Sequence, residues 1–478
     1  MEFKLLNKAS KKHQLYLIDS EAALKQLPDI SKEQQKFASA AFANNQAVVT
    51  FNQYNRFEFV YLLKTKATQS QTDEALRKAG ADLQAVIAKN KLDEITINNL
   101  SGQANAAYLL AEGMALANYQ FLKYKTEAKK QEFSLKTICF SPKSVSVNEL
   151  NQLSVITDAA YRVRTLVNEP VNVLTAVQLA KEIAAMGKEA GFKVTTLNKA
   201  QIEKEKMGGL LAVNKGSQDP PTFTVMEYKP AKALNKKPIV LVGKGVVYDT
   251  GGLSLKPTAN SMDRMKSDMS GAALVSGAMY SVAKLKLPLH IIALIPATDN
   301  RPGETAYTPG DVITMYSGAF VEVLNTDAEG RMILADALHW AKRYKPELVV
   351  DFATLTGAAS VAVGEHGIVC MGTADDNTKQ AFRNSGFRQY ERLVEYPLWD
   401  EYGDMIRSEV ADIKNVGGAS GGAITAGKFL EHFTDYPWMH FDIAGVSFAT
   451  GKKGYQSYGG TGYGLRMLMD FLMHYGKV

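Results

Sequence analysis

The chain is poor in the residues that form disulfide bonds and thiolate metal sites. Its 478 residues include two cysteines, Cys139 and Cys370, and seven histidines. The cysteines form no C-x-x-C or Cys/His pattern, which disfavours a zinc site with thiolate ligands. The histidines show no metal-ligand spacing either. So few cysteines suit a reducing compartment, and we expect both to be small residues of the core.

The chain also lacks long apolar runs and a strong excess of charge of one sign. No stretch of about 18 apolar residues occurs, so we predict no transmembrane helix and no membrane partner. The N-terminal residues hold no apolar segment of signal-peptide length, and we therefore expect a cytoplasmic protein. The 55 lysines and arginines outnumber the 49 aspartates and glutamates, which gives a net charge of +6. This mild excess does not by itself indicate nucleic acid as a partner.

The length fits two domains rather than one core. Residues 1–147 alternate short strand-like and helix-like segments, which predicts a smaller N-terminal α/β domain. Residues 148–170 have the pattern of one connecting helix that ends before a proline. Residues 171–478 contain near-continuous apolar runs, such as 238–243 and 347–355, between helical patterns. They predict a larger C-terminal domain with a central mixed, largely parallel sheet flanked by helices.

Four acidic residues of this larger part lie where strands end or helices begin. Asp249 follows an apolar strand in a glycine-rich loop, and Asp268 stands just before a helical segment. Asp327, Glu329 and Arg331 alternate after the apolar run that begins at 321. In an extended segment, alternate residues point to the same side, so we expect these three to face one way at the end of a buried strand. Sites of open α/β sheets form at the carboxyl ends of strands.

Any one of these acids, taken alone, would be expected to be a loop residue or a helix N-terminal carboxylate. Four together are different, because clustered carboxylates repel one another and are costly to remove from water. Two divalent cations would neutralise them. Oxygen ligands with few histidines suit Mn²⁺, Mg²⁺ or Zn²⁺.

The motifs around these acids resemble those of the leucyl aminopeptidase family, the M17 dinuclear metallopeptidases. NTDAEGR at 325–331 is similar to the family signature, VGKGVVYDTGGLSLKP at 242–257 to its first metal-binding loop, and MDRMKSDMSGAA at 262–273 to its second. Further similar segments, which extend the resemblance over most of the chain, are 111–126, 165–175, 309–313, 351–358, 440–445 and 460–472. The resemblance implies that 171–478 is a catalytic metallopeptidase domain.

The resemblance also implies two divalent metal ions per subunit, Zn²⁺ or Mn²⁺ with Mg²⁺ as a further alternative. Asp249 and Glu329 would bridge the two ions. Asp327 would complete the ligands of one ion, and Lys244 and Asp268 those of the other. A lysine binds metal only as a free amine, and two adjacent dications would depress its pKa far enough for that.

Two further residues would act in catalysis if the resemblance holds. Lys256 would polarise the scissile carbonyl and stabilise the oxyanion. Arg331 would hold a bicarbonate ion, which acts in this family as the general base for the metal-bridging water. The metal ions would also bind the free α-amine of the substrate, and that contact makes such an enzyme an exopeptidase.

The family further implies a substrate pocket and an assembly. Met265, Thr354, Gly357 and Ala444 would surround an apolar pocket for the first side chain, which suits Leu or Met. Leu355 would offer its backbone to the substrate. The substrates would be short peptides, and the assembly would be a homohexamer.

Two function classes follow from the sequence. The first is a metal-dependent leucyl aminopeptidase, which the complete set of expected ligands favours. The second is an additional or replacing DNA-binding or regulatory role, as some family members have. The basic run at 123–131 is expected to be a solvated loop, with a nucleic-acid patch as the alternative. GASGG at 418–422 fits the serine-hydrolase elbow, but it lacks a clear preceding strand, and we expect a glycine loop near the site.

Overall fold

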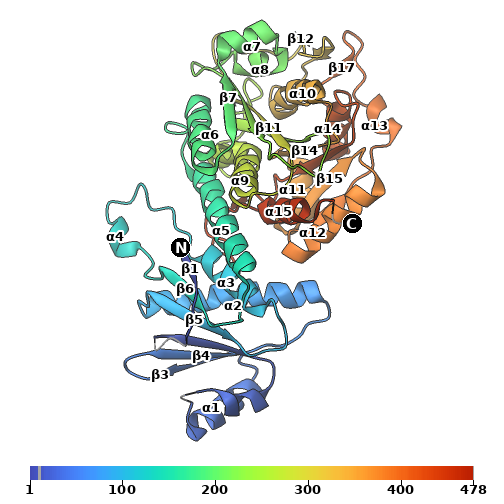
Figure 1. Ribbon diagram of the computed structural model, residues 1–478. Helices are drawn as coiled ribbons and strands as arrows, with labels where there is room; N and C mark the ends of the chain where they lie inside the picture. The colour runs from blue at the N-terminus through green and yellow to red at the C-terminus, as the bar shows by residue number, and fades with distance from the viewer. Residues whose placement is uncertain (9–11, 29, 477–478) are drawn as a thin grey trace. The chain divides into compact units, whose positions relative to one another are not determined.

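The structure is a computed structural model that describes residues 1–8, 12–28 and 30–476 (Figure 1). The chain forms two compact units. Unit 1 comprises Met1–Tyr161 and Gly451–Ser457, and unit 2 comprises Arg162–Thr450 and Tyr458–Val478. The division falls within one helix, α5 (Val147–Asn168). The predicted α/β fold class is confirmed, whereas the predicted domain limits at residues 147 and 170 stay a prediction.

Unit 1 is built on a six-stranded sheet with the strand order β1-β6-β5-β2-β4-β3. Neighbouring strands of the described sheet run parallel, except that β3 is antiparallel to β4. Its strands are β1 (Glu2–Leu5), β2 (Gln14–Ile18), β3 (Val48–Asn52), β4 (Phe57–Leu62), β5 (Glu94–Asn99) and β6 (Thr137–Phe140). Its helices are α1 (Lys32–Ala43), α2 (Gln69–Lys89), α3 (Ala106–Ala117) and α4 (Ala128–Gln131), with a 3-10 turn at Glu21–Gln26.

Helices cover both faces of this sheet. Alternate residues of β2 enter opposite clusters, because Leu15 and Leu17 pack with α2 and α3 while Ile18 packs with α1. The pair α2 and α3 packs closely at two glycines. A Cβ on Gly113 would lie 1.8 Å from the carbonyl oxygen of Arg77, so this helix contact excludes any larger residue.

Unit 2 is built on a nine-stranded mixed sheet with the order β16-β15-β18-β14-β9-β11-β8-β7, to which β10 adds by pairing with β11. Its strands are β7 (Lys193–Leu197), β8 (Thr222–Tyr228), β9 (Ile239–Gly243), β10 (Gly245–Asp249), β11 (Ile291–Asn300), β14 (Leu348–Ala353), β15 (Ile368–Gly372), β16 (Leu393–Glu395) and β18 (Trp438–Asp442). The centre of the sheet, β18-β14-β9-β11, is parallel, and β7, β8 and β15 each run antiparallel to a neighbour. Smaller sheets contain β12 (Val312–Thr314), β13 (Phe320–Glu322), β17 (Ile413–Lys414), β19 (Phe448–Ala449) and β20 (Gly459–Gly460).

Helices lie on both faces of the parallel centre, which is why β9, β11 and β14 are buried along their whole length. The helices α8, α10 and α14 share one apolar cluster with β9 and β14, and α6, α9 and α15 pack together, with α9 against β9 (Figure 1). The helices are α6 (Ala176–Ala190), α7 (Lys199–Glu205), α8 (Gly208–Asn214), α9 (Ser270–Lys284), α10 (Glu329–Ala341), α11 (Gly357–Val363), α12 (Asp376–Gln389), α13 (Asp400–Asp404), α14 (Gly422–Glu431) and α15 (Leu465–His474). Short 3-10 helices span Met262–Met269 (η2), Lys342–Tyr344 (η3) and Gly364–His366 (η4).

The two cysteines lie in the core, and the helices are those of a protein without a membrane span in its described part. Cys139 and Cys370 are both buried and unpaired, as expected for core residues. Burial raises the pKa of Cys139 to about 11 and that of Cys370 to about 12. Among the described residues, no helix has both the length and the apolar character needed to cross a membrane.

A buried carboxylate ties α10 to two other segments of unit 2. Asp336, 1% exposed, accepts hydrogen bonds from the backbone N–H of Leu210 in α8 and of Tyr316 beyond β12, each at 2.9 Å. One side chain thus satisfies backbone donors that burial would otherwise leave without a partner. Since α10 begins at Glu329, Asp336 helps to fix the helix that presents one of the acidic residues.

We expect Asp336→Ala to lower the free energy of unfolding by about 2–4 kcal/mol, because it leaves buried N–H donors without an acceptor. Asp336→Asn keeps one acceptor oxygen and should cost less. Asp376→Ala, at an exposed aspartate of α12, serves as the control and should change stability by no more than about 0.5 kcal/mol. Urea denaturation of the three variants measures these differences, and equal effects of Asp336→Ala and Asp376→Ala would contradict the assignment.

Candidate metal centre

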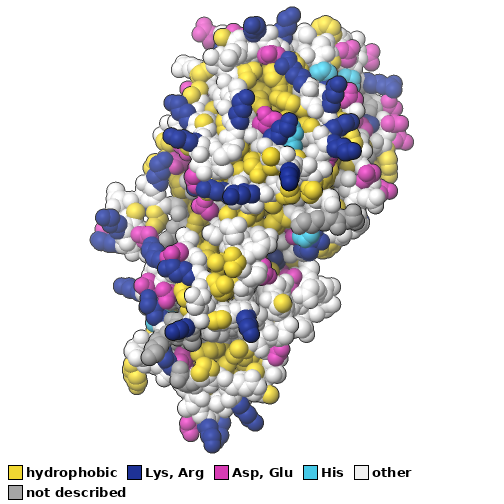
Figure 2. All heavy atoms as spheres, in the orientation of Figure 1, with side chains coloured by type: hydrophobic (Ala, Val, Ile, Leu, Met, Phe, Trp, Pro, Cys, Tyr) yellow, Lys and Arg dark blue, Asp and Glu magenta, His cyan; other side chains and the backbone are white. Residues whose placement is uncertain are grey.

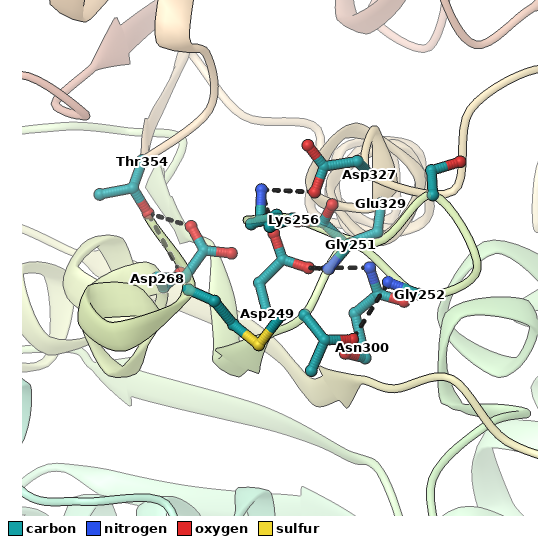
Figure 3. A network of polar contacts seen from close by, with 12 residues as sticks. Asp249, Gly251, Gly252, Lys256, Asp268, Asn300, Asp327, Glu329 and Thr354 are labelled. Carbon is teal, nitrogen blue, oxygen red and sulfur yellow. Dashed lines mark hydrogen bonds and ion pairs between the residues drawn. The ribbon is translucent and has the colours of Figure 1, made fainter. Parts of the chain in front are cut away.

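The acidic residues gather at the carboxyl ends of adjacent strands of unit 2. Lys244 follows β9, Asp249 ends β10, and Thr354 follows β14. Asp268 lies in η2 just before α9, and Glu329 is the first residue of α10. Because β14, β9 and β11 are neighbours and β10 pairs with β11, these sequence-distant loops meet at one edge of the sheet (Figure 3).

Three carboxylates form the centre of this cluster. Asp249, Asp268 and Glu329 each offer one oxygen, and these oxygens lie within 4.8 Å of one another. All three side chains are buried, at 2%, 4% and 1% exposure. Asp327 adds a fourth, partly buried carboxylate on the side of Lys256 (Figure 3).

Two lysines supply the only positive charge that directly contacts these carboxylates among the described residues. Lys244 Nζ lies 2.7 Å from Asp268 Oδ1 and 2.9 Å from Glu329 Oε1. Lys256 Nζ lies 2.9 Å from Asp249 Oδ2 and forms an ion pair with Asp327. Four carboxylates therefore face two ammonium groups, and part of the negative charge stays uncompensated.

The remaining charge shows in the pKa values and in the hydrogen bonding. Burial, with repulsion from Asp249 and Glu329, raises the pKa of Asp327 to about 7, and burial raises the pKa of Asp268 well above its ordinary value. Asp268 Oδ2 and Glu329 Oε2 are buried and have no hydrogen-bond partner in the described part of the chain. Buried carboxylate oxygens without a partner are costly. A divalent cation is the ligand that offsets both the charge and the missing contacts, so these residues fit a metal site.

Polar groups around the cluster hold its carboxylates in place. The N–H of Gly251 and the Nδ2 of Asn300 both donate to Asp249 Oδ1 at 2.8 Å. The hydroxyl of Thr354 donates to Asp268 Oδ1 at 2.7 Å (Figure 3). Sequence reasoning missed Asn300, although it is the last residue of the apolar strand β11, and a polar residue at a strand end is the signal that identified the acids.

The turn after Asp249 requires glycine at two positions. Gly251 and Gly252 have φ values of 86° and 62°, in the left-handed region that other residues avoid. A Cβ on Gly251 would lie 2.8 Å from Asp327 Oδ1, and one on Gly252 would lie 2.8 Å from Asn300 Oδ1. The two glycines thus let the backbone approach the acidic cluster closely.

Arg331 lies in the first turn of α10, so one expectation is wrong. Residues 329–331 are helical rather than extended, and β13 is a short strand of a three-stranded sheet. The alternation of charges from Asp327 to Arg331 therefore does not arise from a strand. Helix α10 begins at Glu329, and a helical turn places neighbouring residues on different faces.

Arg331 is a buried cation that has no acidic partner among the described residues. Its Nη1 donates to the carbonyl oxygen of Asn415 at 2.6 Å, while its Nε is buried without a hydrogen-bond partner. Burial lowers its pKa to about 10, against the opposing effect of Glu329 and Asp442, so the guanidinium stays charged at neutral pH. A buried cation of this kind suits an anionic ligand.

Two of the expected substrate residues are joined by Asp442. Its Oδ1 accepts the N–H of Leu355 and the N–H of Ala444, each at 3.1 Å. Thr354, another of the expected substrate residues, contacts the acidic cluster through its hydrogen bond to Asp268. The structure places Met265 half-buried in η2 and Gly357 exposed at the start of α11.

The face of unit 2 seen in Figure 2 shows a few acidic and basic side chains together, surrounded by hydrophobic side chains.

The GASGG segment offers no competing site. Ser420 lies in an exposed loop before α14, the strand β17 that precedes it has two residues, and no hydrogen bond joins Ser420 to a histidine in the described part of the chain. The nucleophile-elbow interpretation lacks its required geometry.

Comparison with known proteins gives consistent matches. The family model described as "Cytosol aminopeptidase family, catalytic domain" matches residues 161–469. A probable cytosol aminopeptidase of Chloroherpeton thalassium is 44% identical over 431 residues, which cover 84% of each chain. One from Chlorobaculum tepidum is 52% identical over 314 residues, which cover 65% of this chain and 62% of the relative.

Two solved structures extend the similarity to the fold. The bottromycin maturation enzyme BotP in complex with Mn has a TM-score of 0.83 and 28% identity, with 96% of this chain and 98% of that chain covered. A mutant tomato leucine aminopeptidase has a TM-score of 0.86 and 25% identity, with 99% and 96% covered.

We expect Asn300→Ala to weaken Mn²⁺ binding about 10- to 100-fold, because Asp249 loses one of the donors that orient it. Asn235→Ala is the matched control. Asn235 is also a buried asparagine of unit 2, and its Nδ2 donates to the carbonyl oxygen of His290, before β11 begins. Calorimetric titration of metal-free protein with Mn²⁺ measures both affinities. Equal affinity of Asn300→Ala and wild type would show that Asn300 does not orient Asp249.

Proposed function

The chain belongs to the cytosol aminopeptidase family and is a metal-dependent aminopeptidase, and on this premise we propose its substrate, its metal ligands and its catalytic residues. The substrates are short peptides, from which the enzyme releases N-terminal residues, with Leu and similar apolar residues preferred. The observation that carries the proposal is the buried carboxylate cluster, with two oxygens that have no partner.

We propose that the cluster holds two divalent cations, Zn²⁺ or Mn²⁺, with Mg²⁺ as the alternative. Asp249 and Glu329 would bridge them, Asp327 would bind one ion, and Lys244 and Asp268 the other. The four carboxylates carry more negative charge than the two ammonium groups offset, which supports divalent cations here. The number of two ions is inferred from membership of the family. When bound, such ions supply Lewis acidity and make water more acidic.

Lys256 is proposed to stabilise the negative charge that develops on the scissile carbonyl oxygen. Its side chain is 15% exposed, whereas that of Lys244 is 3% exposed, so Lys256 is the lysine that a substrate can reach. Although burial lowers its pKa, the carboxylates of Asp249, Glu329 and Asp327 raise it above the ordinary value. An ammonium that stays charged at neutral pH is suited to this electrostatic role.

Arg331 is proposed to hold a bicarbonate ion that serves as general base. The absence of an acidic partner for Arg331 among the described residues and its unpartnered, buried Nε support an anion beside it. Bicarbonate is small enough to accept two parallel hydrogen bonds from one guanidinium. When bound there, bicarbonate would supply a general base for hydrolysis, and Arg331 would hold and orient it.

The pocket for the first side chain is proposed to involve Met265, Thr354, Gly357 and Ala444. Asp442 holds the backbone N–H groups of Leu355 and Ala444 close together, which supports a substrate pocket whose lining is already in place. The N–H of Leu355 is used in that contact, so the carbonyl of Leu355 is the backbone group proposed to contact the substrate.

We also propose a cytoplasmic homohexamer. The two buried, unpaired cysteines suit a reducing compartment. The assembly is inferred from membership of the family.

Hydrolysis of Leu-p-nitroanilide tests the aminopeptidase activity and the proposed role of Lys256. Metal-stripped protein should be inactive and should regain turnover with Mn²⁺ or Zn²⁺. Lys256→Ala should lower kcat about 10²- to 10³-fold, as expected for the loss of one oxyanion donor, while its Mn²⁺ binding persists. Lys232→Ala, at an exposed lysine of unit 2, is the control. Absence of turnover with every metal, in protein shown to be folded, would exclude leucyl substrates.

Arg331 can be tested through the bicarbonate dependence of the rate. In bicarbonate-free buffer, added bicarbonate should accelerate the wild type and leave Arg331→Ala unchanged, with kcat of the variant lower by about 10²-fold, as for loss of a general base. Arg331→Lys keeps the charge but not the fork of donors and should respond weakly. A thermal melt of each variant controls for folding. A full bicarbonate response in Arg331→Ala would refute the proposed anion site.

A further inference from the structure

A pocket in unit 1 has a strongly basic lining. Its volume is about 810 Å³, and five lysines and one glutamate stand around it. The basic residues are Lys89, Lys91, Lys129, Lys130 and Lys452. Two of them belong to the basic run at 123–131, which the peptidase function leaves unexplained.

Most of this positive charge has no partner. Lys130 pairs with Glu127 at 2.6 Å, and the glutamate of the lining, Glu132, pairs with Lys136 outside it. Within the described part of the chain, the other four lysines have no acidic partner. Their charges repel one another, so an anion that enters the pocket gains attraction from several sides at once.

The pocket brings together residues that are far apart in the sequence. Lys89 ends α2, and Lys129 lies in α4. Lys452 comes from the segment Gly451–Ser457, which belongs to unit 1. That segment is held on α2 by Tyr455, whose hydroxyl donates to Glu74 Oε2 at 3.1 Å. The basic lining is thus fixed by the fold rather than by one flexible run of lysines.

The lining also rests on a buried side chain. Gln84 is fully buried, and its Nε2 donates to Asn118 Oδ1 at 3.1 Å. Because it has no exposed surface, Gln84 supports the lining and is not open to a ligand. Half-buried Phe133 and Ala88 add an apolar part to the lining.

We propose that this pocket binds a small molecule that carries at least two phosphate groups. The unpaired lysines would take the phosphates. The volume lies in the range of small-molecule sites. Nucleic acid is disfavoured because the lysines surround a pocket instead of forming the extended basic stripe that a duplex needs. The site is separate from the metal centre, and the proposal does not depend on the peptidase activity.

Calorimetric titration of the metal-loaded protein with fructose 1,6-bisphosphate and with adenosine 3′,5′-bisphosphate tests the proposal. Both probes carry their phosphates on separate carbon atoms, so neither strips the metal ions as a triphosphate chain would. We expect binding of at least one probe. The double variant Lys89→Ala/Lys129→Ala should weaken it about 10- to 100-fold, because two charge-assisted hydrogen bonds are lost.

The control is Lys32→Ala/Lys36→Ala, which removes the same charge from exposed lysines of α1 in the same unit. It should bind the probe as the wild type does, and hydrolysis of Leu-p-nitroanilide should be unchanged in both double variants, which also shows that both are folded. If both double variants lost the same probe affinity, the effect would come from the net charge of the protein alone, and the proposal would be overturned. So would the absence of binding by both probes, or binding of duplex DNA that depends on Lys89 and Lys129 while neither bisphosphate competes.

Discussion

The constraint on which unit 2 depends is negative charge buried at the carboxyl edge of its central sheet. Asp249, Asp268 and Glu329 lose nearly all contact with water, and their oxygens approach within 4.8 Å. In an apolar interior such a group is unfavourable unless cations compensate it. Lys244 meets part of this requirement within the protein. The charge that stays uncompensated favours binding of cations here, so the same electrostatic cost that destabilises the fold would contribute to the proposed metal binding.

Holding such charges together demands that the surrounding backbone be rigid. The glycine turn at Gly251 and Gly252 adopts left-handed φ values so that the chain can pass beside the acids. Asn300 links Asp249 to the carbonyl oxygen of Thr326, at 2.8 and 3.0 Å. It thereby joins the loop after β10 to the loop before α10. These contacts connect strand ends that only the sheet order brings near, so the site is a property of the whole sheet and not of one motif.

The sequence predicted those parts that depend on local pattern. Apolar runs indicated the buried parallel strands, and polar residues at their ends indicated where Asp249, Asp268 and Glu329 would meet. The extended arrangement of Asp327 to Arg331 was wrong, because two-residue alternation also occurs by chance where a helix begins. The return of Gly451–Ser457 to unit 1 was missed, as was Asn300. These features depend on contacts between residues far apart in the chain, such as the 51-residue separation of Asn300 and Asp249, which periodicity does not encode.

The two lysines of the candidate metal centre, Lys244 and Lys256, differ in their burial and contacts. Lys244 is enclosed by Asp268, Glu329 and the carbonyl oxygen of Thr354, to which its Nζ donates at 2.9 Å. A Cβ on Gly330 would lie 2.4 Å from its Cε, so the missing side chain at Gly330 makes room for Lys244. Lys256 comes from the loop after the glycine turn and keeps some exposure. A fixed and enclosed amine suits a structural or ligand role, whereas an accessible ammonium suits contact with a substrate. Burial, rather than residue type, therefore distinguishes the two proposed roles.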